Sequence, residues 1–400
     1  MISIFLDENN IADLKQDNKS YLLDYKNFDI TKSICLSLPN SKRFYTWDHR
    51  FPPYFETFLP EGYLFEIFKN ILTKKYGYVD DYLIFSLLSP NLEGRVNFET
   101  EFQSLDFEPF DIEEILQNDT SDTFSKLLNT FLDKNAISGV QPKTIAIVKE
   151  KESLHTKEYI IKTWGEEFPY LAENEYFCLN AVKKAGVKTV NIKLSRNNKF
   201  LLVENFIFKD EEVLGFEEIL SLMDKNKINK YQGSYEQVAK IISQFCTNKA
   251  ESLEQFYKTL VMSYLLKNGD AHLKNFGLLF SKDFDTIEFS PAYDIVTTTA
   301  YIFKDKPALT LAGNKIWPSK KALLNFGQKE CLLSKKDALR AYSQCLSALE
   351  ASLCELKTYI EMNPHFEKIG TRMYESWHLS LSGEALKEIS DDTIRTWKES

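Results

Sequence analysis

The sequence pattern of this chain changes near residue 210, and this change restricts the fold more than any other feature. Before it, four short runs of β-forming residues surround one amphipathic stretch over 171–185. After it, most segments repeat apolar residues with the period of a helix. The β-forming runs cover 144–148, 158–162, 192–195 and 200–203, and the helical segments cover 234–246, 251–267, 335–362 and 383–399. We therefore predict an α+β fold with two lobes, a small β-rich one followed by a larger helical one, with a ligand cleft between them.

A further region precedes the β-rich lobe. The run 34–38 predicts a strand that stops at Pro39, and 61–76 predicts a helix that follows Pro60 and ends at Gly77. Acidic side chains are frequent over 99–130, where we expect a connector with one short helix. The predicted division is 1–98 for an N-terminal subdomain, 99–130 for the connector, 131–209 for the β-rich lobe and 210–400 for the helical lobe.

Composition excludes several classes of protein. The 49 basic and 58 acidic residues give a formal net charge of −9, which disfavours non-specific DNA binding by the chain as a whole. The N-terminus lacks the basic and apolar regions of a signal peptide, and no run of 18 apolar residues predicts a membrane span. The six cysteines are scattered and the five histidines form no ligand set, so we expect reduced core thiols in a cytoplasmic protein without a zinc site.

The strongest chemical signal is a pair of polar motifs in the helical lobe. Asp270 lies five residues before Asn275, so one short loop can direct both side chains into the same cleft, and Asp294 follows 19 residues later. In phosphoryl transfer an Asp orients the hydroxyl nucleophile, while an Asn and a second Asp hold Mg²⁺ through hard oxygen atoms. The spacing resembles the catalytic loop and the metal-binding Asp of protein kinases. The alternative is that these side chains only cap helices and turns.

Residues of the β-rich lobe complete this interpretation. Lys162 ends a predicted strand, and a carboxylate of the following helix would hold it against nucleotide phosphates. Glu175 is the predicted partner and Glu173 the alternative, because side chains two positions apart on a helix point in different directions. The segment 136–143, which opens the first hairpin, can offer backbone N–H groups to phosphate. The strand and linker 200–206 can offer backbone groups to adenine, although a plain buried strand has the same side chains.

Together these motifs resemble the HipA family of bacterial toxin kinases. The resemblance covers nearly the whole chain and includes the Gly-x-Gln-x-Lys phosphate loop, an Asn-Glu-aromatic-aromatic-Cys-Leu helix, the hinge, the catalytic and metal motifs and a signature of the N-terminal subdomain. The matching segments are 53–61, 138–143, 172–179, 200–206, 230–234, 268–276 and 290–294.

The resemblance implies a protein-kinase-like fold and ATP- and Mg²⁺-dependent phosphorylation of serine or threonine. It makes Asp270 the catalytic Asp, with Asn275 and Asp294 as Mg²⁺ ligands. Lys162, held by Glu175, would contact the phosphates, and the backbone of Glu204 and Phe206 would hold adenine. The remaining residues expected at the nucleotide are Ser138, Gly139, Val140, Gln141, Lys143, His272 and Lys274.

The sequence departs from the family pattern at two places. The family hinge often reads Glu-Arg-Phe-Asp-Arg, whereas 204–208 reads Glu-Asn-Phe-Ile-Phe. The family's autophosphorylated Ser stands two residues before the small residue of the phosphate loop, and Ala136 occupies that position here. We hypothesise that Ser138 takes the phosphate instead and that its charge switches the kinase off.

The resemblance implies the toxin of a toxin–antitoxin system, which arrests growth by phosphorylating a translation component such as an aminoacyl-tRNA synthetase. The expected partner is a helix-turn-helix antitoxin, through which the chain would contact DNA only indirectly. Three alternatives stand beside this function: an effector kinase exported into a host, a non-catalytic scaffold or corepressor, and a kinase of small molecules or lipids. The intact Lys162, Asp270, Asn275 and Asp294 speak against a scaffold, and the lack of a basic amphipathic segment speaks against a lipid substrate.

Overall fold

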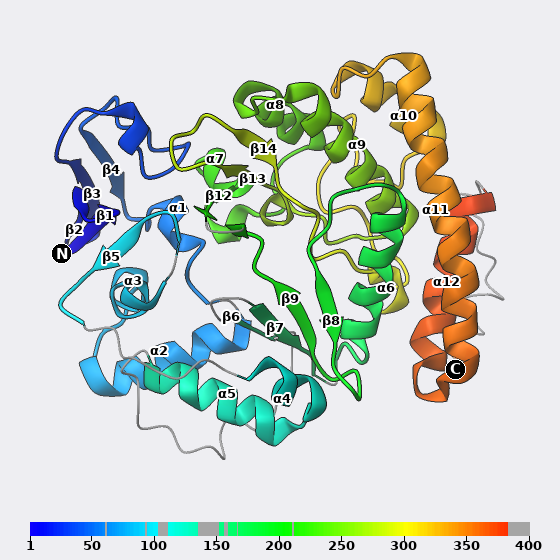
Figure 1. The fold of residues 1–400 in the computed structure, drawn as a ribbon, viewed down its shortest axis with the longest axis horizontal. Coiled ribbons are helices and arrows are strands. Elements are labelled where there is room, and N and C mark those ends of the chain that lie inside the picture. The colour runs from blue at the N-terminus through cyan, green and yellow to red at the C-terminus, as the bar shows by residue number, and fades with distance from the viewer. Residues whose placement is uncertain are drawn as a thin grey trace. The chain divides into compact units, whose positions relative to one another are not determined.

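In the computed structural model, whose ribbon is drawn in Figure 1, the chain comprises two compact units. The first unit comprises Met1–Phe168, Asn191–Lys230 and Gly277–Ile287, and the second comprises Pro169–Val190, Tyr231–Phe276 and Glu288–Ser400. The residues described are 1–60, 62–92, 94–102, 111–134, 152–155, 159–165, 167–209 and 212–382.

The first unit begins with a five-stranded antiparallel sheet in the order β4-β3-β2-β1-β5. Its strands are β1 (Ile2–Leu6), β2 (Asn9–Asp17), β3 (Ser20–Tyr25), β4 (Phe44–Asp48) and β5 (Asn97–Glu99). Alternate residues of β1 are buried, as expected when one face of a sheet covers a core. The helices of this region are the 3-10 turns η1 (Ile30–Lys32) and η2 (Ser89–Asn91) and the α-helices α1 (Pro53–Glu56), α2 (Gly62–Tyr76) and α3 (Asp81–Leu88). Phe55 of α1 and Phe98 of β5 contact Phe85 of α3, with ring centroids 5.4 and 5.2 Å away.

The segment 34–38, predicted as a strand, is irregular, so that prediction is wrong. Ile34, Cys35 and Leu38 are buried, but the backbone of the segment pairs with side chains rather than with a neighbouring strand. Tyr25 accepts a hydrogen bond from the N–H of Ile34 at 3.0 Å, and Arg95 donates to the carbonyl oxygens of Ser33 and Ile34 at 2.6 and 3.3 Å. The run of apolar residues before Pro39 therefore has the sequence pattern of a strand without forming one. The helix predicted over 61–76 is confirmed by α2.

The region predicted as a connector contains two helices, α4 (Ile112–Gln117) and α5 (Ser121–Lys134), where we expected one. Between them, Asp119 is buried and accepts hydrogen bonds from the hydroxyl of Ser195 at 2.6 Å and from the backbone N–H groups of Asn197 and Lys199 at 2.8 and 3.0 Å. A single carboxylate thus fixes the turn between two strands that lie about 80 residues further along the chain.

Those strands belong to a four-stranded sheet in the order β6-β7-β9-β8. It consists of β6 (Glu152–His155), β7 (Tyr159–Thr163), β8 (Ile192–Leu194) and β9 (Leu201–Glu204). The strands predicted over 158–162, 192–195 and 200–203 are confirmed, whereas the run 144–148 lies outside the described residues. In the structure, β6 is the hairpin partner of β7, and Lys162 of β7 lies opposite Leu201 of β9.

Short elements complete the first unit. They are the hairpin of β10 (Phe208–Lys209) and β11 (Glu212–Val213), strand β12 (Gly215–Glu218), helix α7 (Ile219–Leu222), the 3-10 turn η4 (Lys227–Asn229) and strand β13 (Gly277–Phe280), which pairs with β12. In β14 (Ile287–Phe289) the chain passes from the first unit to the second.

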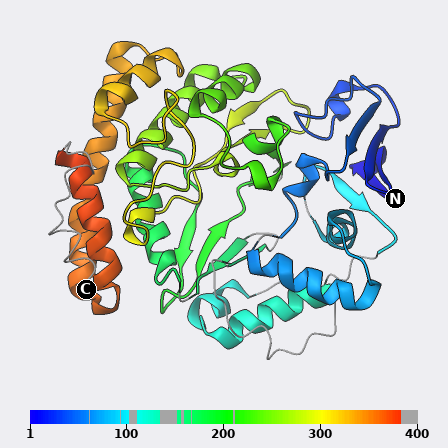
Figure 2. The same ribbon diagram turned by 180° about the vertical axis from the view of Figure 1, so that it is seen from behind.

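The second unit is mainly helical. Its helices are α6 (Leu171–Lys184), α8 (Tyr235–Phe245), α9 (Lys249–Leu265), α10 (Lys320–Lys329), α11 (Lys335–Met362) and α12 (Glu367–Ser382), with 3-10 turns η5 (Leu273–Asn275), η6 (Thr298–Ala300) and η7 (Pro364–Phe366). The predicted helices over 171–185, 234–246, 251–267 and 335–362 are confirmed, and 383–399 lies outside the described residues. Helices α11 and α12 lie side by side in both views (Figures 1 and 2), and α11 also packs against α6 and α9.

Helices α10 and α12 were not predicted from the sequence. Gly370 lies inside α12, where a glycine ordinarily weakens a helix. A Cβ atom at Gly370 would lie 2.5 Å from Cγ1 of Ile360 in α11, so the close approach of the two helices requires this residue. Five of the six cysteines are buried and Cys354 is exposed. Within the described ranges, no helix is long and apolar enough to cross a membrane.

Candidate active site

The loop that bears Asp270 begins where α9 ends. Asn268 is buried, and its side-chain oxygen accepts the N–H of Asp270 at 3.0 Å, which forms a tight turn. The N–H of His272 then donates to the carbonyl of Asp270 at 2.7 Å, and the N–H of Asn275 donates to the carbonyl of His272 at 3.0 Å. The loop therefore closes on itself, while the side chain of Asp270 remains 42% exposed, as a group that meets a substrate must be.

Two side chains surround the carboxylate of Asp270. The hydroxyl of Tyr231 donates to its Oδ1 at 2.8 Å, and Nε2 of the buried His272 lies 3.9 Å from the same oxygen. The rings of Tyr231 and His272 meet edge to face at 5.2 Å. Tyr231 lies in the segment 230–234 that resembles the HipA family, but the sequence does not assign it to the site. It is 39 residues from Asp270, and no local pattern predicts a contact over that separation.

The second half of the site joins Asn275 to Asp294. The side-chain amide of Asn275 donates to the carbonyl oxygen of Asp294 at 3.2 Å and to its carboxylate at 3.1 Å. Asp294 adopts a left-handed backbone with φ 56°, a sparsely populated conformation for a residue with a Cβ atom. The hydroxyl of Tyr293 donates to the carbonyl of Lys274 at 2.7 Å, which joins the same two loops once more. The structure thus brings together the two residues that the sequence predicts as metal ligands.

The chemistry of this pair fits a divalent cation. Asn275 is 7% exposed, and its Oδ1 is buried without a hydrogen-bond partner among the described residues. An unsatisfied buried carbonyl oxygen is costly unless a ligand completes it. Asn275 Oδ1 and the Asp294 carboxylate are the hard oxygen atoms that Mg²⁺ prefers, and Mg²⁺ ordinarily takes only one or two carboxylates from protein.

Helix α6 separates the two glutamates that the sequence left as alternatives. Glu173 is fully buried and accepts hydrogen bonds from Nε2 of His365 at 2.9 Å and from the hydroxyl of Tyr359 at 3.3 Å. The carboxylate of Glu173 is therefore already bound by side chains from the C-terminal part of the second unit. Glu175, also buried, is about 200° further around the helix, on the opposite side. Its pairing with Lys162 stays a prediction.

The remaining predicted residues lie in the first unit or outside the described residues. Lys162 is half-buried in β7, and Phe206 packs edge to face on Phe216 at 5.2 Å. The backbone N–H of Glu204 donates to the carbonyl of Asn191 at 2.9 Å, so any contact of Glu204 with adenine must use another backbone atom. The phosphate-loop residues Ser138, Gly139, Val140, Gln141 and Lys143, and Ala136 before them, lie outside the described residues.

The structure also shows positioning residues that sequence reasoning missed. The hydroxyl of Thr298 accepts the N–H of Gly269 at 2.8 Å and donates to the carbonyl of Lys267 at 3.0 Å. A Cβ atom at Gly269 would lie 1.9 Å from Oδ2 of Asp305 and 2.8 Å from Oγ1 of Thr298, so a larger residue there would displace both side chains. The sequence pattern does not predict contacts of this kind, because each depends on a single residue and not on a repeat of apolar positions.

Comparison with known proteins identifies the fold and then the family. Over 100% of both chains, the structure is similar to that of HipA in the Shewanella oneidensis MR-1 toxin–antitoxin complex of HipA, HipB and operator DNA, with a TM-score of 0.70 and 14% identity. The chain therefore has a HipA-like α+β fold. The sequence models of the HipA-like C-terminal domain and the HipA N-terminal domain match residues 135–353 and 2–99, and the chain belongs to the HipA family.

Two curated relatives carry kinase names. A Haemophilus influenzae protein named "Putative kinase" is 31% identical over 184 residues, which are 42% of this chain and 53% of that protein. A Sinorhizobium fredii protein named "Putative kinase Y4dM" is 23% identical over 327 residues, 74% of this chain and 75% of that protein. This chain thus spans about half the length of the first relative and three quarters of the second.

Proposed function

We propose that this protein is an ATP- and Mg²⁺-dependent serine/threonine protein kinase. The observation that carries the proposal is the second unit's arrangement of an exposed carboxylate, Asp270, in the loop whose last residue, Asn275, contacts Asp294. We assign different roles to Asp270 and Asn275 because their surroundings differ. Asp270 faces solvent, where a substrate hydroxyl can reach it, whereas Asn275 keeps a buried oxygen that a cation would complete.

In the proposed reaction the substrate hydroxyl attacks the γ-phosphorus of ATP, a new O–P bond forms, and the bond to the β–γ bridging oxygen breaks to release ADP. Asp270 orients the hydroxyl and accepts its proton, and Lys162 contacts the phosphates. Asn275 and Asp294 would hold Mg²⁺, which supplies charge neutralisation at the phosphates. Asn268 and Thr298 keep Asp270 in place through the turn that they stabilise.

The same proposal includes the biological role. The Shewanella structure contains HipA together with HipB and operator DNA, which supports a helix-turn-helix antitoxin as partner. The net charge of −9 fits DNA contact through that partner. We propose a component of translation, such as an aminoacyl-tRNA synthetase, as the substrate, and phosphorylation of Ser138 as the step that switches the enzyme off.

The test is incubation of the purified protein with labelled ATP, Mg²⁺ and a bacterial lysate, beside the Asp270→Asn variant. We expect a labelled substrate band that the variant loses by about 10²- to 10⁴-fold, while calorimetry shows unchanged nucleotide binding. Mass spectrometry of the band identifies the substrate and the residue type, and the same digest reports phosphate on 136–144. Nucleotide binding without transfer to any protein would instead support a scaffold or a kinase of small molecules.

A further inference from the structure

The segment that carries Asp294, residues 290–298, is held by hydrogen bonds on both sides of that residue. We call it the Asp294 segment. The groups that hold it come from α6 and from the loop after α6, more than 100 residues earlier in the chain. These contacts all lie within the second unit.

On the C-terminal side, Asn174 of α6 acts as a clamp. Its Nδ2 donates to the carbonyl of Thr297 at 3.1 Å, and its Oδ1 accepts the N–H of Thr297 at 2.7 Å. Both residues are fully buried, so the two bonds form away from water. A carboxamide that satisfies both backbone groups of one residue fixes the direction of the chain at that point, three residues after Asp294.

A second layer fixes the clamp itself. Cys178, one helical turn after Asn174, lies 3.4 Å from both Oδ1 of Asn174 and Oγ1 of Thr297. Trp377 of α12 is fully buried, and its Nε1 donates to the same Oγ1 at 2.8 Å. The side chain of Thr297 is therefore held by both α6 and α12.

On the N-terminal side, the loop after α6 pairs with the segment as a short parallel bridge. The N–H of Ala292 donates to the carbonyl of Lys188 at 2.8 Å, and the N–H of Val190 donates to the carbonyl of Ala292 at 3.1 Å. These bonds lie two residues before Asp294.

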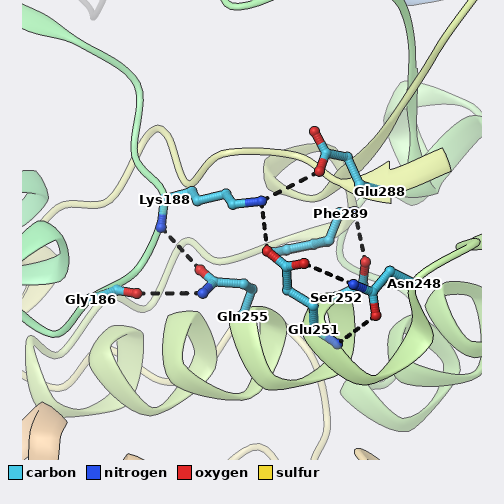
Figure 3. A network of polar contacts seen from close by, with 8 residues as sticks. All are labelled: Gly186, Lys188, Asn248, Glu251, Ser252, Gln255, Glu288 and Phe289. Carbon is cyan, nitrogen blue, oxygen red and sulfur yellow. Dashed lines mark hydrogen bonds and ion pairs between the residues drawn. The ribbon is translucent and has the colours of Figure 1, made fainter. Parts of the chain in front are cut away.

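The loop after α6 is in turn fixed to α9, as Figure 3 shows. Gln255 of α9 accepts the N–H of Lys188 at 3.0 Å and donates to the carbonyl of Gly186 at 3.4 Å. The ammonium group of Lys188 lies 2.8 Å from Glu251 and 3.4 Å from Glu288. Because α9 leads directly into the Asp270 loop, one helix supports both loops of the site.

We propose that Asn174 is a positioning residue for the divalent cation of this enzyme: its carboxamide holds the Asp294 segment so that Asp294 stays beside Asn275 before any cation binds. The inference rests on the proposed kinase function. Helix α6 would then have two roles in the site. Asn174 holds the Asp294 segment, and the next residue, Glu175, is the predicted partner of Lys162. Residues that orient metal ligands typically change metal affinity by 10- to 100-fold when they are altered.

The test measures the binding of Mn²⁺, as a spectroscopic probe for Mg²⁺, by electron paramagnetic resonance in the presence of a non-hydrolysable ATP analogue. Asn174→Asp keeps the acceptor for the N–H of Thr297, but it loses the donor to the carbonyl. We expect Mn²⁺ binding to weaken by about 10- to 100-fold in this variant, while binding of the analogue without metal is unchanged. The control is Asn180→Asp on the same helix, whose amide donates to the carbonyl of Tyr176 at 2.9 Å; Mn²⁺ binding should stay at the wild-type value.

The results for the variant and for the wild type distinguish failure of the positioning role from failure of the proposed function. Wild-type Mn²⁺ affinity in Asn174→Asp would overturn the positioning role, whereas absence of Mn²⁺ binding in the wild type would overturn the proposed function itself. If Asn174→Asp fails to fold, hydrogen exchange of the wild type decides. The N–H of Thr297 should be protected without metal, and protection that appears only after Mn²⁺ and the analogue are added would contradict the inference.

Discussion

The hydroxyl of Tyr231 donates a hydrogen bond of 2.8 Å to Oδ1 of Asp270. The phenol is itself 42% exposed, so this contact is formed at the surface of the second unit rather than in its core. Lys315 fixes the backbone of Tyr231 by donating from Nζ to its carbonyl at 3.0 Å. Tyr231 therefore occupies one oxygen of the proposed catalytic carboxylate and determines how that carboxylate is oriented toward a substrate hydroxyl.

We expect Tyr231→Phe to lower kcat for phosphoryl transfer by about tenfold, because a hydrogen bond to a charged group contributes roughly 1.5 kcal/mol or more. The KM for ATP should change little, since the hydroxyl donates to Asp270, which is proposed to act on the substrate hydroxyl. Steady-state kinetics measure both. The control is Tyr374→Phe in α12, where the removed hydroxyl lies on a ring stacked with His378. An unchanged kcat in Tyr231→Phe would contradict the assigned role.

A buried lysine precedes the Asp270 loop and gives a prediction about pH. Lys267 has a left-handed backbone with φ 57°, and its ammonium group lies 5.0 Å from the ring centre of Trp317. Burial lowers the pKa of Lys267 to about 8. Between that pH and the ordinary pKa of about 10.4, the unfolded chain binds more protons than the folded one, so stability rises with pH in this window. Below pH 8 the lysine is protonated in both the folded and the unfolded chain, so burial of its charge lowers the free energy of unfolding by the full amount.

We therefore expect Lys267→Met to raise the free energy of unfolding at pH 7 by roughly 2–3 kcal/mol and to remove the rise between pH 8 and 10. Denaturant unfolding at several pH values measures both effects. Lys320→Met is the matched control, because Lys320 also lies over a ring, that of Tyr342, but is exposed; its effect should stay within about 0.5 kcal/mol. Equal stability of Lys267→Met and wild type at pH 7 would show that the ammonium group is not penalised by burial.

Arg95 holds the N-terminal region of the first unit together. Its guanidinium group is buried and donates to the carbonyl oxygens of Ser33, Ile34 and Lys282, and it lies 4.3 Å from the ring centre of Phe284. Arg95→Lys keeps the charge but loses the planar set of donors. We expect the free energy of unfolding to fall by about 1.5–3 kcal/mol, because several buried carbonyl oxygens lose their donor.

Thermal or denaturant unfolding measures this loss, with Arg43→Lys as the control. Arg43 contacts Asp24 at 3.2 Å through a side chain that is 55% exposed, and exposed ion pairs contribute little. If the two variants lost the same small amount of stability, Arg95 would not have the structural role that its contacts indicate.

Local sequence patterns account for helices α2, α6, α8, α9 and α11 and for strands β7, β8 and β9. The long apolar repeat over 335–362 coincides with α11, because a continuous 3.6-residue period depends only on near neighbours. Asp270 and Asn275 likewise share one loop because only five residues separate them. The prediction for 34–38 is wrong because its run of apolar residues is typical of a strand, while its backbone partners, Tyr25 and Arg95, are side chains from elsewhere in the chain.

The sequence by itself determined the α+β class, helices α2, α6, α8, α9 and α11, and the residue types of the candidate site. Tertiary structure alone decided which of these residues meet. The clamp of Asn174 on Thr297 and the engagement of Glu173 by His365 join residues 123 and 192 positions apart. The physical reason is that periodicity reports the environment of each residue, buried or exposed. The partner of a buried polar group depends instead on which distant segment the packed core brings within hydrogen-bond distance.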